Sequence, residues 1–195
     1  MKKFVTFEGI DGSGKSTISK LVYKKLKSEG HNVILTYEPT DSEIGKIVQQ
    51  CISKKSDPYV TVFTFIADRL EHGKQITGWL DEGNIVLCDR YADSTYSYQG
   101  AQLQETIDNP IKWLKELSKG IIPIPDRTFL FIIEPQQAIN RIENRNNLIP
   151  FEKLEFLQKV HENYLKLAKE KRFKKIDATK TINELVEICY KDILS

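Results

Sequence analysis

One short segment near the start of the chain constrains its fold more than any other feature. Gly9–Ser16 reads GIDGSGKS and fits the pattern G-x-x-x-x-G-K-[ST]. Lys2–Glu8, which precedes it, is rich in β-branched and aromatic residues and predicts a strand, and Ser16–Glu29 carries apolar residues at helical spacing. A strand, a glycine-rich loop and a helix in this order predict a phosphate-binding P-loop, and with it an α/β fold.

The residue types of this loop suit the binding of a polyphosphate. Glycines let the backbone turn sharply and approach an anion, and the following helix adds the positive end of its dipole. We expect Lys15 to hold the β- and γ-phosphates of a nucleoside triphosphate and Ser16 to offer its hydroxyl to Mg²⁺. The residues assigned to this site are Gly9, Ile10, Asp11, Gly12, Ser13, Gly14, Lys15, Ser16 and Thr17.

Composition narrows the classes of function. The chain has 195 residues, of which 40% are hydrophobic, enough for one domain with its own core. A net charge of +2 gives no support to binding of nucleic acid or of an anionic membrane. The 3 cysteines and 3 histidines lack the spacing of a disulfide framework or a zinc site, which favours a reducing compartment. Without a long apolar run, the sequence predicts a single soluble domain in the cytoplasm.

Strand and helix patterns alternate along the chain. Further strands are expected at Asn32–Tyr37, Ile85–Cys88, Arg127–Ile133 and Phe173–Asp177. Helices are expected at Ser42–Ser53, at Asp57–Glu82, from Pro135, from Phe151 to about Lys171, and after the capping box of Thr181 and Glu184. This order predicts a three-layer α/β domain with a five-stranded parallel sheet flanked by helices, and ligands at the carboxyl ends of the strands.

Two charged residues follow the apolar strand Ile85–Cys88. Asp89 can hold Mg²⁺ or its waters, as the Walker B carboxylate does, and Arg90 can bind an oxyanion through two parallel hydrogen bonds. The alternative is a surface ion pair that caps the strand, which the P-loop makes the less favoured interpretation.

Three segments resemble one enzyme family. Asp89–Gly100, DRYADSTYSYQG, is similar to the D-R-Y-x-x-S-x-x-A-Y-Q-G signature of thymidylate (dTMP) kinases. Phe4–Thr17 resembles the P-loop of that family, and Phe63–Arg69 resembles its nucleobase-binding helix. The resemblance spans nearly the whole chain. It implies transfer of the γ-phosphoryl of ATP to dTMP, giving dTDP and ADP for dTTP synthesis, and a homodimer for which Asp57–Glu82 is one candidate contact element.

The resemblance also assigns an acceptor site. Phe65 would stack on thymine, for which core packing is the alternative, and Arg69, one turn later, would hydrogen-bond a base carbonyl. Gln99 would read the pyrimidine edge, Tyr98 would crowd the 2′ position, and Asp11 would contact the acceptor sugar near its 3′-OH. The full acceptor set is Asp11, Glu38, Phe65, Arg69, Arg90, Ser94, Tyr98 and Gln99.

A lid is expected at about 141–151. The P-loop contains no arginine, whereas Arg141 and Arg145 precede Asn146-Asn147-Leu148, which resembles the bacterial type with an arginine delivered by lid closure. This implies that Arg145 acts in catalysis with Lys15, Arg90 and Asp89, and that Arg141 lies in the ATP site. The alternative for both lid arginines is a solvated helix surface.

Two residues depart from the family pattern. Tyr37 precedes Glu-Pro where many members have arginine, and Ser97 replaces a small alanine. Because tyrosine is a single neutral donor, a related kinase with a different or broader acceptor is one alternative. A P-loop ATPase that switches a partner is the other, although Phe65, Arg69 and Gln99 together favour an acceptor pocket.

Overall fold

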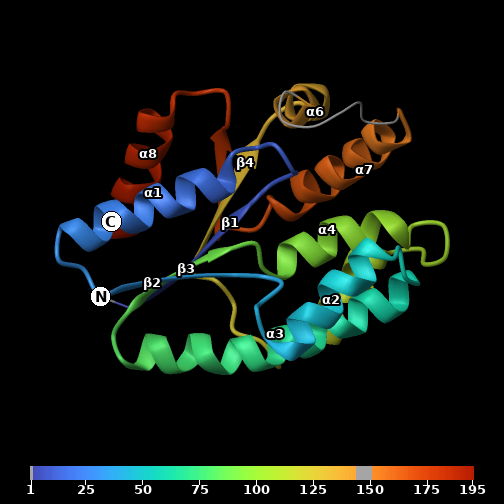
Figure 1. Cartoon of the computed structure of the whole chain (residues 1–195), viewed down its shortest axis with the longest axis horizontal. Coiled ribbons are helices and arrows are strands. Elements are labelled where there is room, and N and C mark those ends of the chain that lie inside the picture. Colours follow the sequence, from blue (N-terminus) through green and yellow to red (C-terminus); the bar gives the residue numbers. More distant parts are fainter. Residues whose placement is uncertain (1, 144–150) are drawn as a thin grey trace.

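A parallel β-sheet forms the centre of the protein in the computed structural model, which describes residues 2–143 and 151–195 (Figure 1). Its strands are β1 (Lys3–Glu8), β2 (Val33–Tyr37), β3 (Ile85–Asp89), β4 (Arg127–Ile132) and β5 (Phe173–Asp177). Within the described residues they form one five-stranded sheet in the order β2-β3-β1-β4-β5, with every neighbouring pair parallel. The predicted parallel sheet is confirmed.

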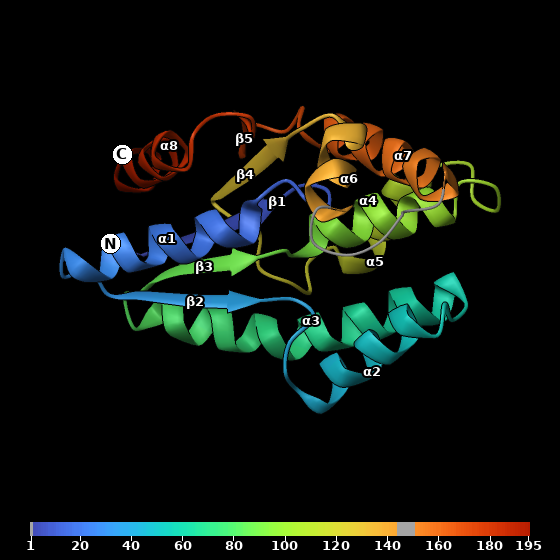
Figure 2. The same cartoon turned by 45° about the horizontal axis from the view of Figure 1, so that its top comes forward.

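Helices connect the strands and cover both faces of the sheet. They are α1 (Lys15–Ser28), α2 (Glu43–Ser53), α3 (Pro58–Asp81), α4 (Ala92–Gln102), α5 (Pro110–Ser118), α6 (Pro135–Glu143), α7 (Phe151–Leu167) and α8 (Ile182–Leu194). Figure 2 shows α1 and α8 on one side of the sheet and α3 on the other, which gives the three predicted layers.

The two faces of the sheet form two separate cores. Successive side chains of a strand point to opposite faces. Val5 and Leu87 therefore pack into the core that α1 and α8 cover, whereas their neighbours Phe4 and Val86 pack into the core beneath α3. Burial on both sides explains why the central strands are continuously apolar, as parallel strands usually are.

Three of the predicted helix starts have side-chain caps. The Ser42 hydroxyl accepts a hydrogen bond from Gly45 N at 2.9 Å, and the Asp57 carboxylate accepts from Tyr59 N at 2.8 Å. Thr181 and Glu184 form the predicted capping box in both directions. α7 ends at Leu167, a few residues before the predicted end.

α4 and α5 are helices that the sequence patterns did not predict. Most residues of α4 are buried, including its serines, its threonine and Gln99, so the segment has no polar face to mark a helical period. α4 lies at the carboxyl end of the sheet against α5 and α7 (Figure 1). It therefore forms a wall beside the strand ends where ligands are expected.

α3 extends beyond the sheet. Its C-terminal part packs beneath β3, and its N-terminal part continues past the carboxyl ends of the strands, where α2 lies alongside it (Figure 2). Among the residues that the structure describes, none of the helices is long and apolar enough to cross a membrane.

Candidate active site

The P-loop joins β1 to α1 and depends on its glycines. Gly9 and Gly12 have φ of 142° and 84°. A Cβ at Gly9 would lie 2.7 Å from the carbonyl oxygen of Phe131, and one at Gly12 would lie 2.3 Å from that of Ala138. The loop therefore packs directly on the backbone of β4 and α6. Gly14 caps α1 with φ of 88° and no side-chain hydrogen bond, so the N-terminus of α1 stays open to an anion.

Lys15 is buried at the floor of this loop. Its side chain is 6% exposed, and its Nζ lies 4.0 Å from Oδ1 of Asp11. Burial and the positive charge of Arg90 lower the pKa of Lys15 to about 8. A buried cation with one distant carboxylate partner is well suited to bind phosphate oxygens.

Arg90 links the P-loop to α4. It follows β3 with φ of 68°, and its Nη2 donates to Oδ1 of Asp11 at 2.6 Å while Nη1 donates to Oγ of Ser94 at 2.9 Å. Its guanidinium lies 5.2 Å from the ring centroid of Tyr98. The Tyr98 hydroxyl accepts from Asp11 N at 3.1 Å and lies 3.3 Å from Oδ2 of the same residue. The structure thus brings together four of the residues predicted for the two substrate sites.

The charge of Asp11 is held by its neighbours. Burial by itself would raise the pKa of this carboxyl, but the positive charges of Arg90 and Lys15 outweigh that effect and lower it. Asp11 is therefore ionised at neutral pH, and its half-exposed side chain points its charge into the space between the P-loop and α4.

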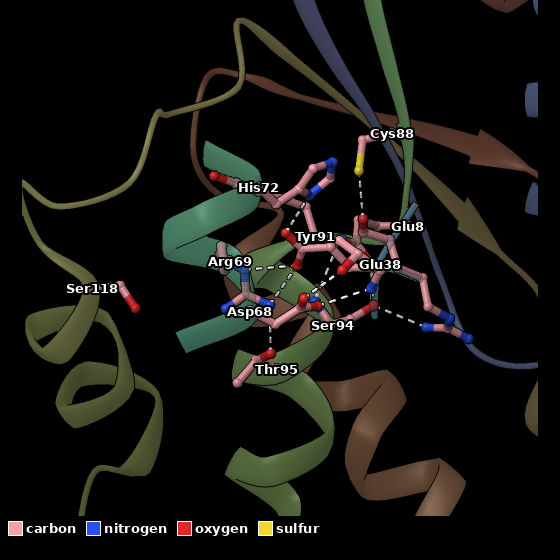
Figure 3. A network of polar contacts seen from close by, with 12 residues as sticks. Glu8, Glu38, Asp68, Arg69, His72, Cys88, Tyr91, Ser94, Thr95 and Ser118 are labelled. Atoms are coloured by element: carbon pink, nitrogen blue, oxygen red, sulfur yellow. Dashed lines mark hydrogen bonds and ion pairs between the residues drawn. The ribbon is translucent and has the colours of Figure 1, made fainter. Parts of the chain in front are cut away.

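Glu8, which was not predicted as a site residue, belongs to the same polar network as Ser94 (Figure 3). Its carboxylate accepts from Tyr91 N at 2.7 Å, from the Ser94 hydroxyl at 2.7 Å and from the Tyr164 hydroxyl at 2.9 Å. Burial, together with the negative charge of Asp93, raises the pKa of Glu8 to about 7. The Ser94 hydroxyl also accepts a hydrogen bond from Nη1 of Arg90. Through Tyr91 and Ser94, Glu8 fixes the start of α4 relative to β1.

Asp89 and Ser16 are the residues predicted for Mg²⁺. Oδ1 of Asp89 is buried and has no hydrogen-bond partner among the described residues, and Ser16 is exposed in the first turn of α1. No group of three or more metal-ligating side chains occurs in the described part of the chain. These residues fit a Mg²⁺ ion that takes most of its ligands from nucleotide phosphates and water.

A second buried cluster lies where the end of β2 meets α3 (Figure 3). Arg69 is 1% exposed, and its Nε and Nη2 each lie 2.8 Å from Oε2 of Glu38. Nη2 also donates to Oγ1 of Thr95 at 2.9 Å, whereas Nη1 is buried without a partner among the described residues. The other carboxylate oxygen of Glu38 lies 2.9 Å from Nδ1 of His72.

Aromatic rings surround the guanidinium of Arg69. It lies 6.0 Å from the ring centroid of Phe65 and 5.3 Å from that of Tyr91. Phe65 is 9% exposed, and this burial fits core packing as well as the wall of a pocket. Gln99 is buried on α4.

The two departures from the family pattern are also located. Tyr37 is 44% exposed at the end of β2, and its hydroxyl donates to the Asp41 carboxylate. Ser97 is fully buried on α4, and its hydroxyl has no partner in the described part of the chain. Tyr37 therefore lies at the surface, whereas the acceptor-side cations Arg69 and Arg90 come from α3 and from the end of β3.

A cavity of about 590 Å³ opens beside the P-loop. Lys15, Ser16, Thr17 and Arg141 line it, together with the segment after β5 that contains Ala178. Nη2 of Arg141 donates to the carbonyl oxygen of Ala178 at 3.1 Å. The cavity has the size of a small-molecule site. Arg141 shares its lining with the P-loop residues, and the role of Arg141 in ATP binding stays a prediction.

Comparison with known proteins identifies the family to which this arrangement belongs. The family model described as thymidylate kinase matches residues 7–188. The chain belongs to the thymidylate kinase family. A probable thymidylate kinase of Methanosarcina mazei is 41% identical over 98% of this chain and 95% of its own length. Another, from Sulfurisphaera tokodaii, is 40% identical over 96% of this chain and 93% of its own length. A third, from Sulfolobus acidocaldarius, is 42% identical over 94% and 92%.

Family membership makes the chain a kinase, as the sequence patterns predicted, and it favours neither a P-loop switch nor a kinase for another acceptor. Within this thymidylate kinase fold, Ile10 is 1% exposed and belongs to the core, so only its backbone can contribute to phosphate binding. Arg145 and most of the predicted lid lie outside the described residues and stay predictions.

Sequence patterns missed Glu8, His72, Thr95 and Tyr164, which complete the polar networks of the site. His72 follows Arg69 by three residues on one helix, a spacing that places both on the same face. That spacing was the one available signal for His72.

Proposed function

We propose that this chain transfers the γ-phosphoryl group of ATP to dTMP, giving ADP and dTDP for dTTP synthesis. The observation that carries the proposal is the buried Nη1 of Arg69, which has no hydrogen-bond partner among the described residues and whose guanidinium lies beside Phe65. Buried donors without a partner are rare in proteins, and a nucleobase carbonyl would complete this one. Membership of the thymidylate kinase family supports thymine as that base.

In the proposed reaction, a phosphate oxygen of dTMP attacks the γ-phosphorus of ATP, and the bond to the β–γ bridging oxygen breaks, releasing ADP. Lys15 binds the β- and γ-phosphate oxygens, and Arg90 binds the acceptor phosphate and the transferring group. Arg90 can do so by exchanging the Asp11 carboxylate for phosphate oxygens, after which Asp11 is free to contact the acceptor sugar. These residues act by positioning and charge neutralisation.

Ser16 and Asp89 are proposed to hold Mg²⁺, which when bound would neutralise charge on the β- and γ-phosphates. Oδ1 of Asp89, which lacks a hydrogen-bond partner in the part of the chain that the structure describes, supports this role, because a water that the metal holds could donate to it. Arg141 is proposed to lie against ATP in the cavity beside the P-loop, and Arg145 to add positive charge at the transferring group when the lid closes.

We also propose a homodimer that forms through α2 and α3. Both helices expose apolar side chains, among them Ile47, Ile52, Val60 and Phe63, the last with 53% of its surface exposed. Sedimentation velocity should give a dimer for the wild-type chain and a monomer for Phe63→Glu, and a wild-type monomer would contradict this proposal. All three cysteines are buried free thiols, which fits the proposed cytoplasmic location.

A coupled ADP-release assay tests the proposed reaction. Mg-ATP is combined in turn with dTMP, dUMP, ribo-TMP, dCMP, AMP and GMP, and chromatography identifies the product. We expect a strong preference for dTMP and formation of dTDP. A different preferred acceptor would move the function to a related kinase, and ADP release without any acceptor would indicate an ATPase.

A variant of Arg69 ties that preference to the pocket. Arg69→Met keeps an apolar stem but removes the guanidinium with all of its donors, and should raise the KM for dTMP while the KM for ATP is unchanged. An unchanged KM for dTMP would exclude Arg69 from base recognition.

A further inference from the structure

His72 contacts the acceptor-site cluster from the side opposite to Arg69. It is 1% exposed, its Nδ1 lies 2.9 Å from Oε1 of Glu38, and its Nε2 lies 2.7 Å from Oγ1 of Thr36. Because an ionised carboxylate only accepts hydrogen bonds, Nδ1 carries the proton that joins His72 to Glu38. The imidazole ring is also held edge-on to Trp79, with 6.3 Å between the ring centroids.

The two oxygens of Glu38 have different partners. Oε2 accepts from Nε and Nη2 of Arg69, and Oε1 accepts from Nδ1 of His72. A carboxylate held at both oxygens cannot rotate, so the guanidinium plane of Arg69 is fixed through Glu38. Thr95 holds Nη2 from the other side. The nitrogen left over is Nη1, the donor proposed to bind the base carbonyl.

We propose that His72 is a positioning residue that sets base recognition: through Glu38 it fixes the direction of the Arg69 Nη1–H group that binds the base carbonyl. The inference rests on the proposed function, because it assigns the carbonyl to the dTMP base. His72 touches neither substrate in this scheme. Its effect therefore belongs to acceptor recognition, and ATP binding at the P-loop is independent of it.

Two substitutions separate the two hydrogen bonds of the imidazole. In His72→Asn the amide nitrogen can occupy the position of Nδ1 and still donate to Glu38. In His72→Gln the amide reaches the position of Nε2 and contacts Thr36, but Glu38 loses its donor. Thr36→Val removes the other hydrogen bond at nearly constant volume and serves as the matched control.

The expected readout is a split between the two Michaelis constants. Loss of a hydrogen bond to a charged group is typically worth about tenfold or more, so His72→Gln should raise the KM for dTMP by about tenfold. His72→Asn and Thr36→Val should change it by less than about threefold, since one weaker hydrogen bond is lost. The KM for ATP should be unchanged in all three variants.

A thio-substituted acceptor tests whether the effect passes through the base carbonyl. Sulfur accepts hydrogen bonds weakly, so the wild-type protein already lacks that contact with whichever of 2-thio-dTMP and 4-thio-dTMP carries sulfur at the bound position. The penalty of His72→Gln should then shrink to less than about threefold, as expected for two changes that remove the same interaction. Equal penalties for dTMP and for both thio analogues, or equal effects of the asparagine and glutamine substitutions, would overturn the inference.

The wild-type protein offers a measurement that does not depend on folding of a variant. The chain has 3 histidines, so the Nδ1–H resonance of His72 can be assigned by NMR. It should shift when dTMP binds and stay in place when ATP binds, and a resonance unaffected by dTMP would overturn the inference. Failure of the wild-type protein to phosphorylate dTMP would instead overturn the proposed function.

Discussion

Glu8→Gln should change how the stability of the protein depends on pH. Burial and the charge of Asp93 raise the pKa of the Glu8 carboxyl from 4.5 to about 7 in the folded chain. A raised folded-state pKa means that the folded chain binds the proton more tightly, so the stability it contributes is complete below pH 4.5 and is lost as the pH rises through about 7. The difference between the two values corresponds to about 3 kcal/mol.

Glutamine at position 8 cannot ionise, and it keeps the shape of the side chain. The free energy of unfolding of Glu8→Gln minus that of the wild-type protein should therefore rise by about 2.5 kcal/mol between pH 5 and pH 8. Urea unfolding followed by circular dichroism, without nucleotide, measures both curves. Any cost of the amide in the hydrogen-bond network is the same at every pH and cancels from the slope.

The exposed Glu105→Gln controls for the loss of one carboxylate charge at the surface. The reasoning would be refuted if the difference in unfolding free energy between Glu8→Gln and wild type changed by less than about 0.5 kcal/mol from pH 5 to pH 8, because such a change lies within the extrapolation error. It would mean that Glu8 ionises in the folded chain as readily as in the unfolded chain.

Other predictions concern the P-loop. Lys15→Ala should lower kcat by at least ~10², because it removes a preorganised charge at the transferring group, and near-normal turnover in the coupled assay would exclude that role. Burial and the charge of Arg90 lower the pKa of Lys15 to about 8. Because the triphosphate favours the protonated amine, the affinity for ATP should fall as the pH rises above about 8. A calorimetric Kd that is constant from pH 7 to about 9.5 would contradict this expectation. Gly12→Ala should destabilise the protein by roughly 1–3 kcal/mol in urea unfolding and weaken ATP binding. The reason is that the added Cβ would lie 2.3 Å from the Ala138 oxygen, at a φ of 84°. Gly78→Ala is the control, because a Cβ at that position meets open space. Equal stability of the two variants would argue against the packing of Gly12 on Ala138. Excess EDTA should abolish dTDP formation and Mg²⁺ should restore it, and turnover that persists in EDTA would contradict the proposed metal site.

The parts of the fold that could be predicted depend on signals within a few residues of each other. The capping box of Thr181 and Glu184 and the N-cap of Asp57 are local hydrogen-bond patterns, and the apolar run of β3 reflects burial on both faces. α4 gave no such signal. Nearly all of its residues are buried, so the contrast between polar and apolar faces that reveals most helices is missing.

The residues of the candidate site also differ in whether a local sequence pattern predicts them. The spacing of the P-loop and the signature after β3 indicated Lys15 and Arg90. The pairing of Glu38 with Arg69 and His72 joins residues 31 and 34 positions apart, and it depends on how the end of β2 packs against α3. No local pattern encodes that packing. Glu8 was missed because a glutamate beside a strand end reads equally well as a solvated residue.

The burial of α4 makes this helix one of the most rigid parts of the enzyme. Amide protons of a helix that packs against α3, α5 and α7 exchange with solvent only when much of the domain unfolds. α4 should therefore be among the slowest-exchanging segments, with or without nucleotide. Tyr98 and Gln99 therefore belong to a rigid helix, and we expect the substrates and the surrounding loops to adjust to that helix during each turnover.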